Sequence, residues 1–258
     1  MSLYPAASNH TGNLLRHLGD PDWNVLQPDL EEWSAPSGTV LHHPGDTVQF
    51  VYFPCGQSLI SYLIVLSDGR AIETVLIGRE GACGGIISQG TFPAYAQAEV
   101  QQGATFLRIA VPQLEEAKMR SLTIRHLFAR YADCLMAQVF QSVACNAAHS
   151  IEQRAAKWLV AVSTRTGLAD IALTQEQLAS MLGVGRSYLN RVTRNLQAQG
   201  LIQTRRGGIA ITDMPALRAR QCECNRMVVR HFEEVLAGIY PADSDPKPLS
   251  GCQKRRAR

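Results

Sequence analysis

The stretch LTQEQLASMLGVGRSYLNRVTRNLQAQGLI, residues 173–202, predicts two helices joined by a tight turn. At its start, the Thr174 hydroxyl can cap a helix while Gln177 reaches back to the cap amide. The first helix is expected to end at Gly183, because glycine tolerates the left-handed backbone that such a turn requires. A second helix is then expected to begin near Arg186.

The second helix separates polar from apolar side chains. At about 100° per residue, Leu189, Val192 and Leu196 fall within an arc of roughly 60°, so they are expected to face the core. The polar residues span roughly 140° on the opposite side. A guanidinium group fits the O6 and N7 acceptors of guanine, and an asparagine amide can pair with adenine or hold a phosphate. The polar face consists of Arg186, Ser187, Asn190, Arg191 and Arg194.

The next residues, GLIQTRRGGIAIT, predict a small hairpin. Strands are expected at 201–204 and 209–212, with Arg205 and Arg206 between them, where arginines would contact phosphates without reading sequence. Together with Thr174 and Gln175, these arginines complete the predicted DNA-binding set.

A charged helix face is most often merely solvated, so the interpretation depends on several signals together. The helix cap, the glycine turn, three arginines with no acidic residue among them and the basic hairpin follow one another in the order of a winged helix-turn-helix. Its second helix would lie in the major groove of double-stranded DNA. The alternative is a ligand-sensing module whose C-terminal domain binds a protein, which would show a shallower salt dependence than DNA binding.

The N-terminal half has a different pattern. From Gly38 to about Ile109, short runs rich in valine, isoleucine, tyrosine and leucine are separated by glycine- and proline-containing turns. LISYLIVL and RAIETVLIG, joined through Ser67-Asp68-Gly69, predict a hairpin. Apolar residues on both faces of these strands favour a roll or sandwich.

From Ser121 to about His149 there is no glycine or proline, which predicts one long helix. At about 1.5 Å per residue it would span roughly 40 Å, more than one small domain covers, so we expect it to form a homodimer seam. Burial within one subunit is the alternative. The residues assigned to the seam are Ile124, Phe128, Tyr131, Leu135 and Val139.

These segments predict an α+β chain with five parts. They are a β-roll sensory domain (1–120), a dimerisation helix (121–149), a winged helix-turn-helix (150–216), a C-terminal helix (217–240) and a disordered tail (241–258).

Composition agrees with a folded protein that has two electrically different halves. Hydrophobic residues make up 46% and charged residues 18% of the 258 residues, which is typical of globular domains. Residues 1–120 carry six basic and twelve acidic side chains, a net charge of −6, whereas 151–220 carry ten and four, a net charge of +6. A basic domain joined to an acidic one is compatible with a nucleic-acid reader. With no apolar run of about 20 residues and no signal-peptide pattern, a cytoplasmic protein without membrane contact is expected.

The chain resembles the Crp/Fnr family of bacterial transcription regulators over nearly its whole length. The quoted stretch is similar to the family pattern L-T-x-E-x-L-A-x-x-L-G-x-x-R-x-x-V-x-R. Arg186 and Arg191 stand at its two arginine positions, which belong to the recognition helix. The family often has glutamate where this chain has Ser187. The resemblance implies a cyclic-nucleotide-binding-like jelly roll, a homodimer and RNA polymerase as a further partner.

The part of the roll that resembles an effector site departs from the cyclic-nucleotide binders. After the Gly81–Gly84 turn, Gly85 stands where they have a glutamate for the ribose, and AYAQAEV contains no arginine for the phosphate. A buried phosphate without a cation is poorly compensated, so cyclic AMP is not expected and the effector stays unidentified. The residues assigned to an effector site are Gly84, Gly85 and Gln97.

Seven cysteines without framework spacing indicate reduced thiols. Cys222 and Cys224 form a C-x-C pair, but only His231 and Cys252 lie nearby in sequence, so two thiols on a C-terminal helix are favoured over a metal or redox site. No cysteine precedes Cys55, which argues against the family's N-terminal iron-sulfur cluster. A single-thiol response at Cys55 or Cys83 stays open.

The remaining alternative is a cupin-like metal enzyme built on the roll. Cupins need about three histidines with a carboxylate on neighbouring strands. His42 and His43 stand alone before His126 and are expected on the surface or in a loop. We therefore predict no enzyme, no metal and no cofactor.

Overall fold

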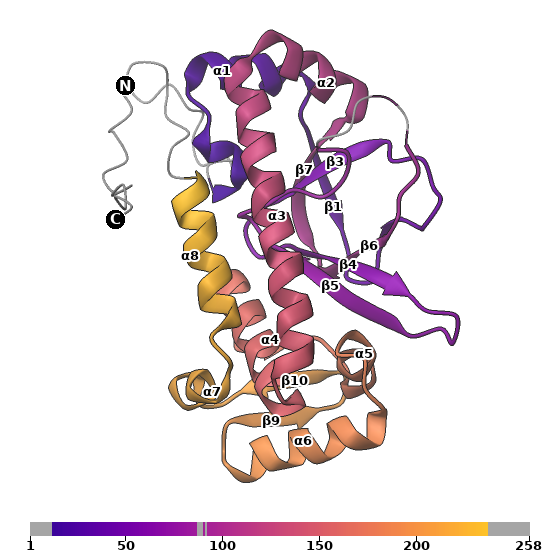
Figure 1. Cartoon of the computed structure of the whole chain (residues 1–258), viewed down its shortest axis with the longest axis vertical. Coiled ribbons are helices and arrows are strands. Elements are labelled where there is room, and N and C mark those ends of the chain that lie inside the picture. The colour runs from indigo at the N-terminus through magenta and orange to yellow at the C-terminus, as the bar shows by residue number, and fades with distance from the viewer. Residues whose placement is uncertain (1–11, 87–89, 91, 237–258) are drawn as a thin grey trace, which may run out of the picture.

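The computed structural model describes residues 12–236 apart from 87–89 and 91. Figure 1 shows a β-roll, a long helix α3 that runs down the middle of the view beside the roll, and a smaller, mostly helical domain at the lower end. This order agrees with the predicted α+β architecture. None of the described helices is both long and apolar enough to cross a membrane.

The roll consists of two antiparallel sheets. The predicted hairpin is present, and Gly69 in its turn has a φ of +82°. One sheet has the order β1-β7-β3 and the other β2-β6-β4-β5. The strands are β1 (Glu31–Ala35), β2 (Val40–His42), β3 (Phe50–Pro54), β4 (Leu59–Val65), β5 (Ala71–Ile77), β6 (Gln97–Gln102) and β7 (Ala104–Ala110).

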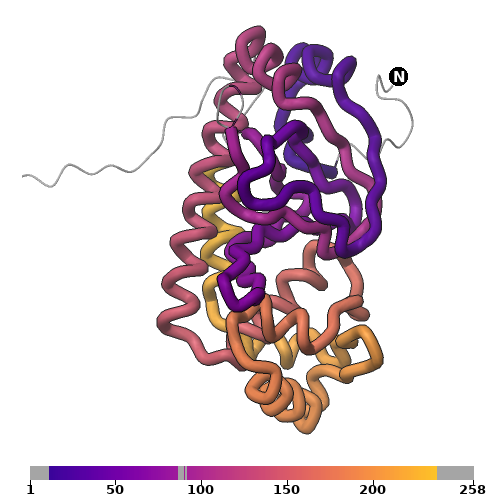
Figure 2. The backbone as a smooth tube through the Cα atoms, turned by 90° about the vertical axis from the view of Figure 1, so that its right-hand side faces the viewer, coloured from indigo at the N-terminus to yellow at the C-terminus, as the bar shows by residue number. Residues whose placement is uncertain are grey.

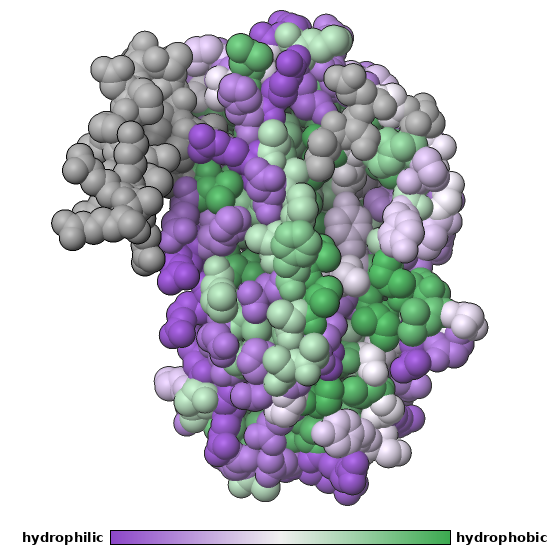
Figure 3. Space-filling model, viewed as in Figure 1, coloured by the Kyte–Doolittle hydropathy of each residue, from purple (hydrophilic) through white to green (hydrophobic). Residues whose placement is uncertain are grey.

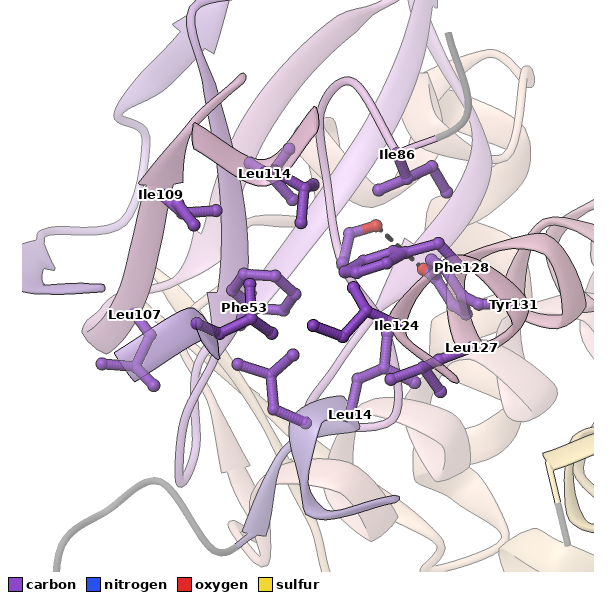
Figure 4. Packing of buried hydrophobic residues seen from close by; sticks show 14 of the residues in the cluster. Leu14, Phe53, Ile86, Leu107, Ile109, Leu114, Ile124, Leu127, Phe128 and Tyr131 are labelled. Carbon is purple, nitrogen blue, oxygen red and sulfur yellow. Dashed lines mark hydrogen bonds between the residues drawn. The ribbon is translucent and has the colours of Figure 1, made fainter. Parts of the chain in front are cut away.

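Short helices cover the end of the roll that faces α3. They are η2 (Leu14–His17), α1 (Asp20–Leu26), η3 (Gln27–Asp29) and α2 (Val111–Arg120). Figure 4 shows how strand residues such as Phe53 and Leu107 pack against Leu14, Leu114 and Phe128. This core fixes the upper part of α3 to the roll.

Helix α3 (Leu122–Ala148) matches the predicted 121–149 to within one residue at each end. The Ser121 hydroxyl accepts a hydrogen bond from the Ile124 amide at 3.1 Å, which defines its start.

Most of the residues predicted for a dimer seam are instead buried within their own chain. Ile124, Phe128 and Tyr131 are at most 1% exposed and pack into the roll of their own chain. The Tyr131 hydroxyl also donates to the Ala82 carbonyl at 2.9 Å (Figure 4). Leu135 packs against the same core, and Val139 alone of the five counts among the exposed large apolar residues. The alternative reading, burial within one subunit, is therefore correct for most of this stripe.

The C-terminal domain follows α3 through a sharp turn. Its small sheet has the order β8-β10-β9. The elements are α4 (Ile151–Thr166), β8 (Asp170–Ile171), α5 (Gln175–Met181), α6 (Arg186–Ala198), β9 (Ile202–Arg205), β10 (Gly208–Ile211), α7 (Met214–Arg220) and α8 (Cys224–Leu236).

The predicted single C-terminal helix at 217–240 is wrong. Gln221 has an extended backbone that ends α7, and α8 begins only at Cys224. Helix α8 then runs back along α3 (Figures 1 and 2), and Val228, Phe232 and Leu236 pack into the core of the roll. The predicted tail, 241–258, lies outside the described residues.

Candidate nucleic-acid interface

The first helix of the predicted pair is capped as its sequence indicated. The Gln177 amide donates to Thr174 Oγ1 at 3.1 Å, and the Thr174 amide donates to Gln177 Oε1 at 2.9 Å. Leu178 and Ala179 on the inner face of α5 are buried. These contacts fix the helix that supports α6.

The turn between α5 and α6 depends on Gly183. Its φ is +70°, a conformation that side-chain-bearing residues rarely adopt. The Val184 amide donates to the Ala179 carbonyl at 2.9 Å and closes the turn. The chain can therefore reverse and start α6 at Arg186.

Helix α6 presents its two faces as predicted. Leu189 and Leu196 are 0% exposed and Val192 is 8% exposed, and all three pack with α4, α5 and the small sheet. Thr193, also buried, donates to the Leu189 carbonyl at 3.1 Å. This apolar back anchors the helix at the end of the molecule, where Figure 1 shows it along the lower edge.

The outer face of α6 is polar and cationic. Arg186, Ser187, Arg191 and Arg194 are exposed, and Asn190 is half-buried. Arg186 Nη1 lies 3.8 Å from Glu176 Oε2, but both side chains are about 70% exposed, so this ion pair is weak.

One residue of this face was missed by the sequence analysis. The guanidinium of Arg191 lies 5.1 Å from the ring centre of Tyr188, which is 43% exposed. The signal was available in the three-residue spacing of an aromatic and an arginine on one helix. Tyr188 therefore belongs to the same surface.

The predicted wing is present, with each strand shifted by one residue. Gly207 in its turn has a φ of +78°, and Arg205 and Arg206 are exposed. Arg205 Nη1 forms an ion pair with Asp170 Oδ2 at 2.7 Å, so part of its charge is already compensated. Thr174 is exposed, whereas Gln175 is half-buried and accepts a hydrogen bond from Thr193 Oγ1 at 3.3 Å.

Comparison with known proteins agrees with this geometry. A family model described as the Crp-like helix-turn-helix domain matches residues 153–220, from α4 to the end of α7. Residues 153–220 therefore form a Crp-like helix-turn-helix domain, the kind of domain with which transcription regulators bind DNA. None of the curated protein sequences matches it.

Solved structures of bacterial regulators share the fold of about three quarters of this chain. FixK2 from Bradyrhizobium japonicum is 16% identical with a TM-score of 0.61, and the match covers 75% of this chain and 98% of FixK2. The c-di-GMP-responsive regulator CLP from Xanthomonas campestris is 16% identical with a TM-score of 0.62, covering 76% and 100%. A CRP-family regulator from Thermus thermophilus is 18% identical with a TM-score of 0.61, covering 74% and 95%.

In this chain the helix-turn-helix domain is held against the β4–β5 hairpin. The Ala71 amide donates to Ser180 Oγ at 3.0 Å, and Ser180 Oγ lies 3.3 Å from the Ala71 carbonyl. Arg165 pairs with Glu80 at 2.7 Å, which holds the pKa of that carboxyl below its ordinary value despite burial. These contacts couple the position of the domain to the roll.

The roll contains a cavity of about 450 Å³ between the hairpin and α3. Its lining is mostly apolar and includes Val75, Phe92, Tyr95 and, from α3, Val139. Of the residues predicted for an effector site, Gly84 lines this cavity. Gly85 instead packs near Phe92 and Val111, and the Gln97 amide donates to Glu99.

Two other predictions need correction. His42 is not a surface residue: it is 7% exposed, lies 6.2 Å from the Tyr62 ring between centroids, and burial lowers its pKa. Cys222 and Cys224 do not share a helix, since Cys222 lies in the α7–α8 connection. The sequence neighbour His231 is seven residues into α8, whereas Cys145 and His149 of the α3 end lie next to the pair.

Proposed function

We propose that this protein is a sequence-specific transcription regulator that reads a two-fold-symmetric DNA site as a homodimer through α6. The observation that carries the proposal is the exposed cationic face of α6 on a buried apolar back. Such a helix can enter the major groove, where arginine and asparagine read base edges. Arg206 of the wing, and Arg205 in part, would contact phosphates.

A second copy of the chain is supported by a stripe on the outer face of α3. Leu122, Ala129, Met136 and Val143 recur every seven residues, and all four are exposed. Seven-residue spacing of apolar side chains is the pattern of two helices packed along each other. Figure 3 shows apolar atoms along the visible face of α3. We name Leu122, Ala129, Met136 and Val143 the α3 stripe.

Two α3 stripes in contact would place two copies of α6 on one side of the dimer. Helix-turn-helix dimers read half-sites about one DNA turn, or roughly 34 Å, apart. We therefore propose a palindromic site with this spacing. RNA polymerase as a partner stays a prediction that comes from the family likeness.

The roll is proposed to respond to a ligand other than cyclic AMP, or to none. Among the described residues that line its cavity there is no lysine or arginine. The one histidine of the lining, His42, has a pKa lowered by burial, so a phosphate there would meet no permanent cation, and this is costly in an apolar cavity. The cavity suits an uncharged, largely apolar molecule better than a nucleotide.

Binding to DNA selected from genomic fragments tests the proposed reading helix. Across 50–200 mM salt we expect the logarithm of affinity to fall with a slope of about −0.9 per neutralised phosphate. Arg186→Ala should weaken the preferred site by roughly 10- to 100-fold and relax base choice, since a bidentate contact discriminates by about 1–3 kcal/mol. Arg206→Ala should weaken preferred and random DNA alike.

Arg120→Ala is the matched control. Arg120 is an exposed helical arginine on α2, at the opposite end of the molecule from α6 (Figure 1). Its loss should leave DNA affinity unchanged. A shallow salt dependence, with Arg186→Ala equal to Arg120→Ala, would instead support a protein partner for this domain.

A further inference from the structure

Four potential metal ligands meet where the end of α3 approaches the α7–α8 connection. Cys145 lies in the last turn of α3 and His149 is its C-cap, while Cys222 and Cys224 come from the connection and the first residue of α8. Their ligand atoms all lie within 4.8 Å of one another. The three cysteines are buried as a small cluster of their own, apart from the apolar cores.

The distances in this cluster match the edges of one tetrahedral metal ion. With Zn–S of about 2.3 Å and Zn–N of about 2.0–2.1 Å, a tetrahedron separates two sulfurs by about 3.8 Å and a sulfur from a nitrogen by about 3.6 Å. Cys145 Sγ and Cys222 Sγ lie 3.7 Å apart, and Cys224 Sγ and His149 Nδ1 lie 3.5 Å apart. A four-iron cluster spreads its thiolates over separate iron atoms and would need them further apart.

We propose that Cys145, His149, Cys222 and Cys224 bind one Zn²⁺ ion in a structural Cys₃His site. Three thiolates and one imidazole are a ligand set that selects zinc, and four protein ligands leave no open position for catalysis. The C-x-C pair seen in the sequence supplies two of the ligands. Long-range folding brings in the other two.

The surroundings of the four ligands fit a bound cation. Glu223 Oε2 lies 3.7 Å from His149 Nε2, on the far side of the ring from Cys224, and a carboxylate there orients a metal-binding imidazole. The Gln141 amide donates to Cys224 Sγ at 3.1 Å. Zn²⁺ with three thiolates carries one net negative charge, and Lys157 Nζ, 3.4 Å from Cys145 Sγ, would compensate it.

The position of the site gives the ion a specific structural role. It would tie the end of α3 to the segment that turns α7 into α8, with Lys157 of α4 alongside. The DNA-binding domain leaves α3 and returns to it at this one place. A metal there would fix the angle at which the domain leaves the helix, and its binding free energy would add to folding.

Metal analysis of the full-length protein tests the site. The protein is purified without a metal-binding tag in reducing buffer, and its zinc content is measured by inductively coupled plasma mass spectrometry. We expect one zinc ion per chain, and Co²⁺ added to zinc-depleted protein should give the visible bands of tetrahedral cobalt thiolate. Cys145→Ala and Cys222→Ala should each lower zinc content by about tenfold or more.

Cys134→Ala is the control, because Cys134 is a buried cysteine of the same helix whose surroundings are the roll core. It should keep its zinc. If the site variants do not fold, the zinc content and cobalt spectrum of the unaltered protein still decide the question. The proposal is overturned by unaltered protein without zinc or cobalt bands, by iron with sulfide, by a Cys145–Cys222 disulfide in fresh protein, or by equal zinc loss in Cys134→Ala.

Discussion

Glu73 is a carboxyl at the contact between the roll and the DNA-binding domain. Ser61 Oγ donates to it at 2.6 Å and Trp158 Nε1 at 2.9 Å. Burial outweighs these hydrogen bonds and raises its pKa from 4.5 to about 7. The folded protein therefore holds this proton more tightly than the unfolded chain does.

This difference predicts a pH dependence of stability. Between pH 4.5 and about 7 the folded state binds more protons at Glu73, so its contribution to the free energy of unfolding falls as pH rises and is lowest above pH 7. Glu73→Gln should remove that fall and melt at a higher temperature than the unaltered protein at pH 8, with a smaller difference at pH 5. Thermal melting at both pH values measures it.

Glu116→Gln serves as the control, since Glu116 is exposed on α2. The comparison between variants isolates Glu73 from His17 and His42, whose pKa values are lowered by burial. Parallel pH profiles for Glu73→Gln and the unaltered protein would contradict the assignment.

Individual residues could be predicted where the signal was local. Leu189, Val192 and Leu196 followed from helical periodicity, and Thr174 followed from a capping pattern four residues long. Glu73 carried no such signal, because its burial depends on Trp158, 85 residues away.

The long helix α3 illustrates the same limit for a whole element. Its length and bounds were predictable because the segment lacks glycine and proline, and Ser121 can cap it. Which face turns inward was not, since α3 has two apolar faces and periodicity alone does not rank them. Four of the five residues assigned to the seam pack in the roll core, and the exposed α3 stripe lies on the other side.

The α3 stripe predicts how the chain assembles. The unaltered protein should be a dimer, and Val143→Glu should shift it to monomer at micromolar concentration, because a buried unpaired carboxylate opposes packing. Sedimentation equilibrium measures the mass. Ala144→Glu places the same charge on the adjacent exposed position, about 100° around the helix from Val143, and should stay dimeric.

If the unaltered protein is a monomer, the proposed dimer contact through the α3 stripe is wrong. Equal masses for Val143→Glu and Ala144→Glu would place the dimer contact elsewhere.

At the scale of the whole molecule, α3 joins the roll cavity to the proposed dimer surface. Val139 lines the cavity and lies on α3 between Met136 and Val143 of the α3 stripe. A ligand there would touch the helix that sets the spacing of the two reading helices. Through differential contact it could shift the population of dimer arrangements.

Calorimetry with cyclic AMP checks what this cavity accepts. Because no lysine or arginine is among its described lining residues, we expect no heat of binding at micromolar nucleotide. A protein that binds cyclic AMP, titrated in the same buffer, is the positive control. A micromolar dissociation constant would show that a cation reaches the phosphate after all.

The arrangement of the molecule was predictable in outline because the order of its parts follows local patterns. Two features depended on contacts between distant segments and were missed: the meeting of Cys145 with Cys222 and the break between α7 and α8. Cys145 and Cys222 are 77 residues apart in the sequence, so no local pattern links them, whereas in the folded chain their sulfurs lie 3.7 Å apart.

The return of α8 along α3 means that the core of the roll is not built from one continuous piece of chain. Phe232 packs edge-on against Tyr131 with ring centres 6.3 Å apart, in the same core as Leu14. A fragment cut after α3 would leave that core open to water, even though it contains every strand of the roll. A fragment that contains the roll and α3 therefore also needs α8 to complete its core.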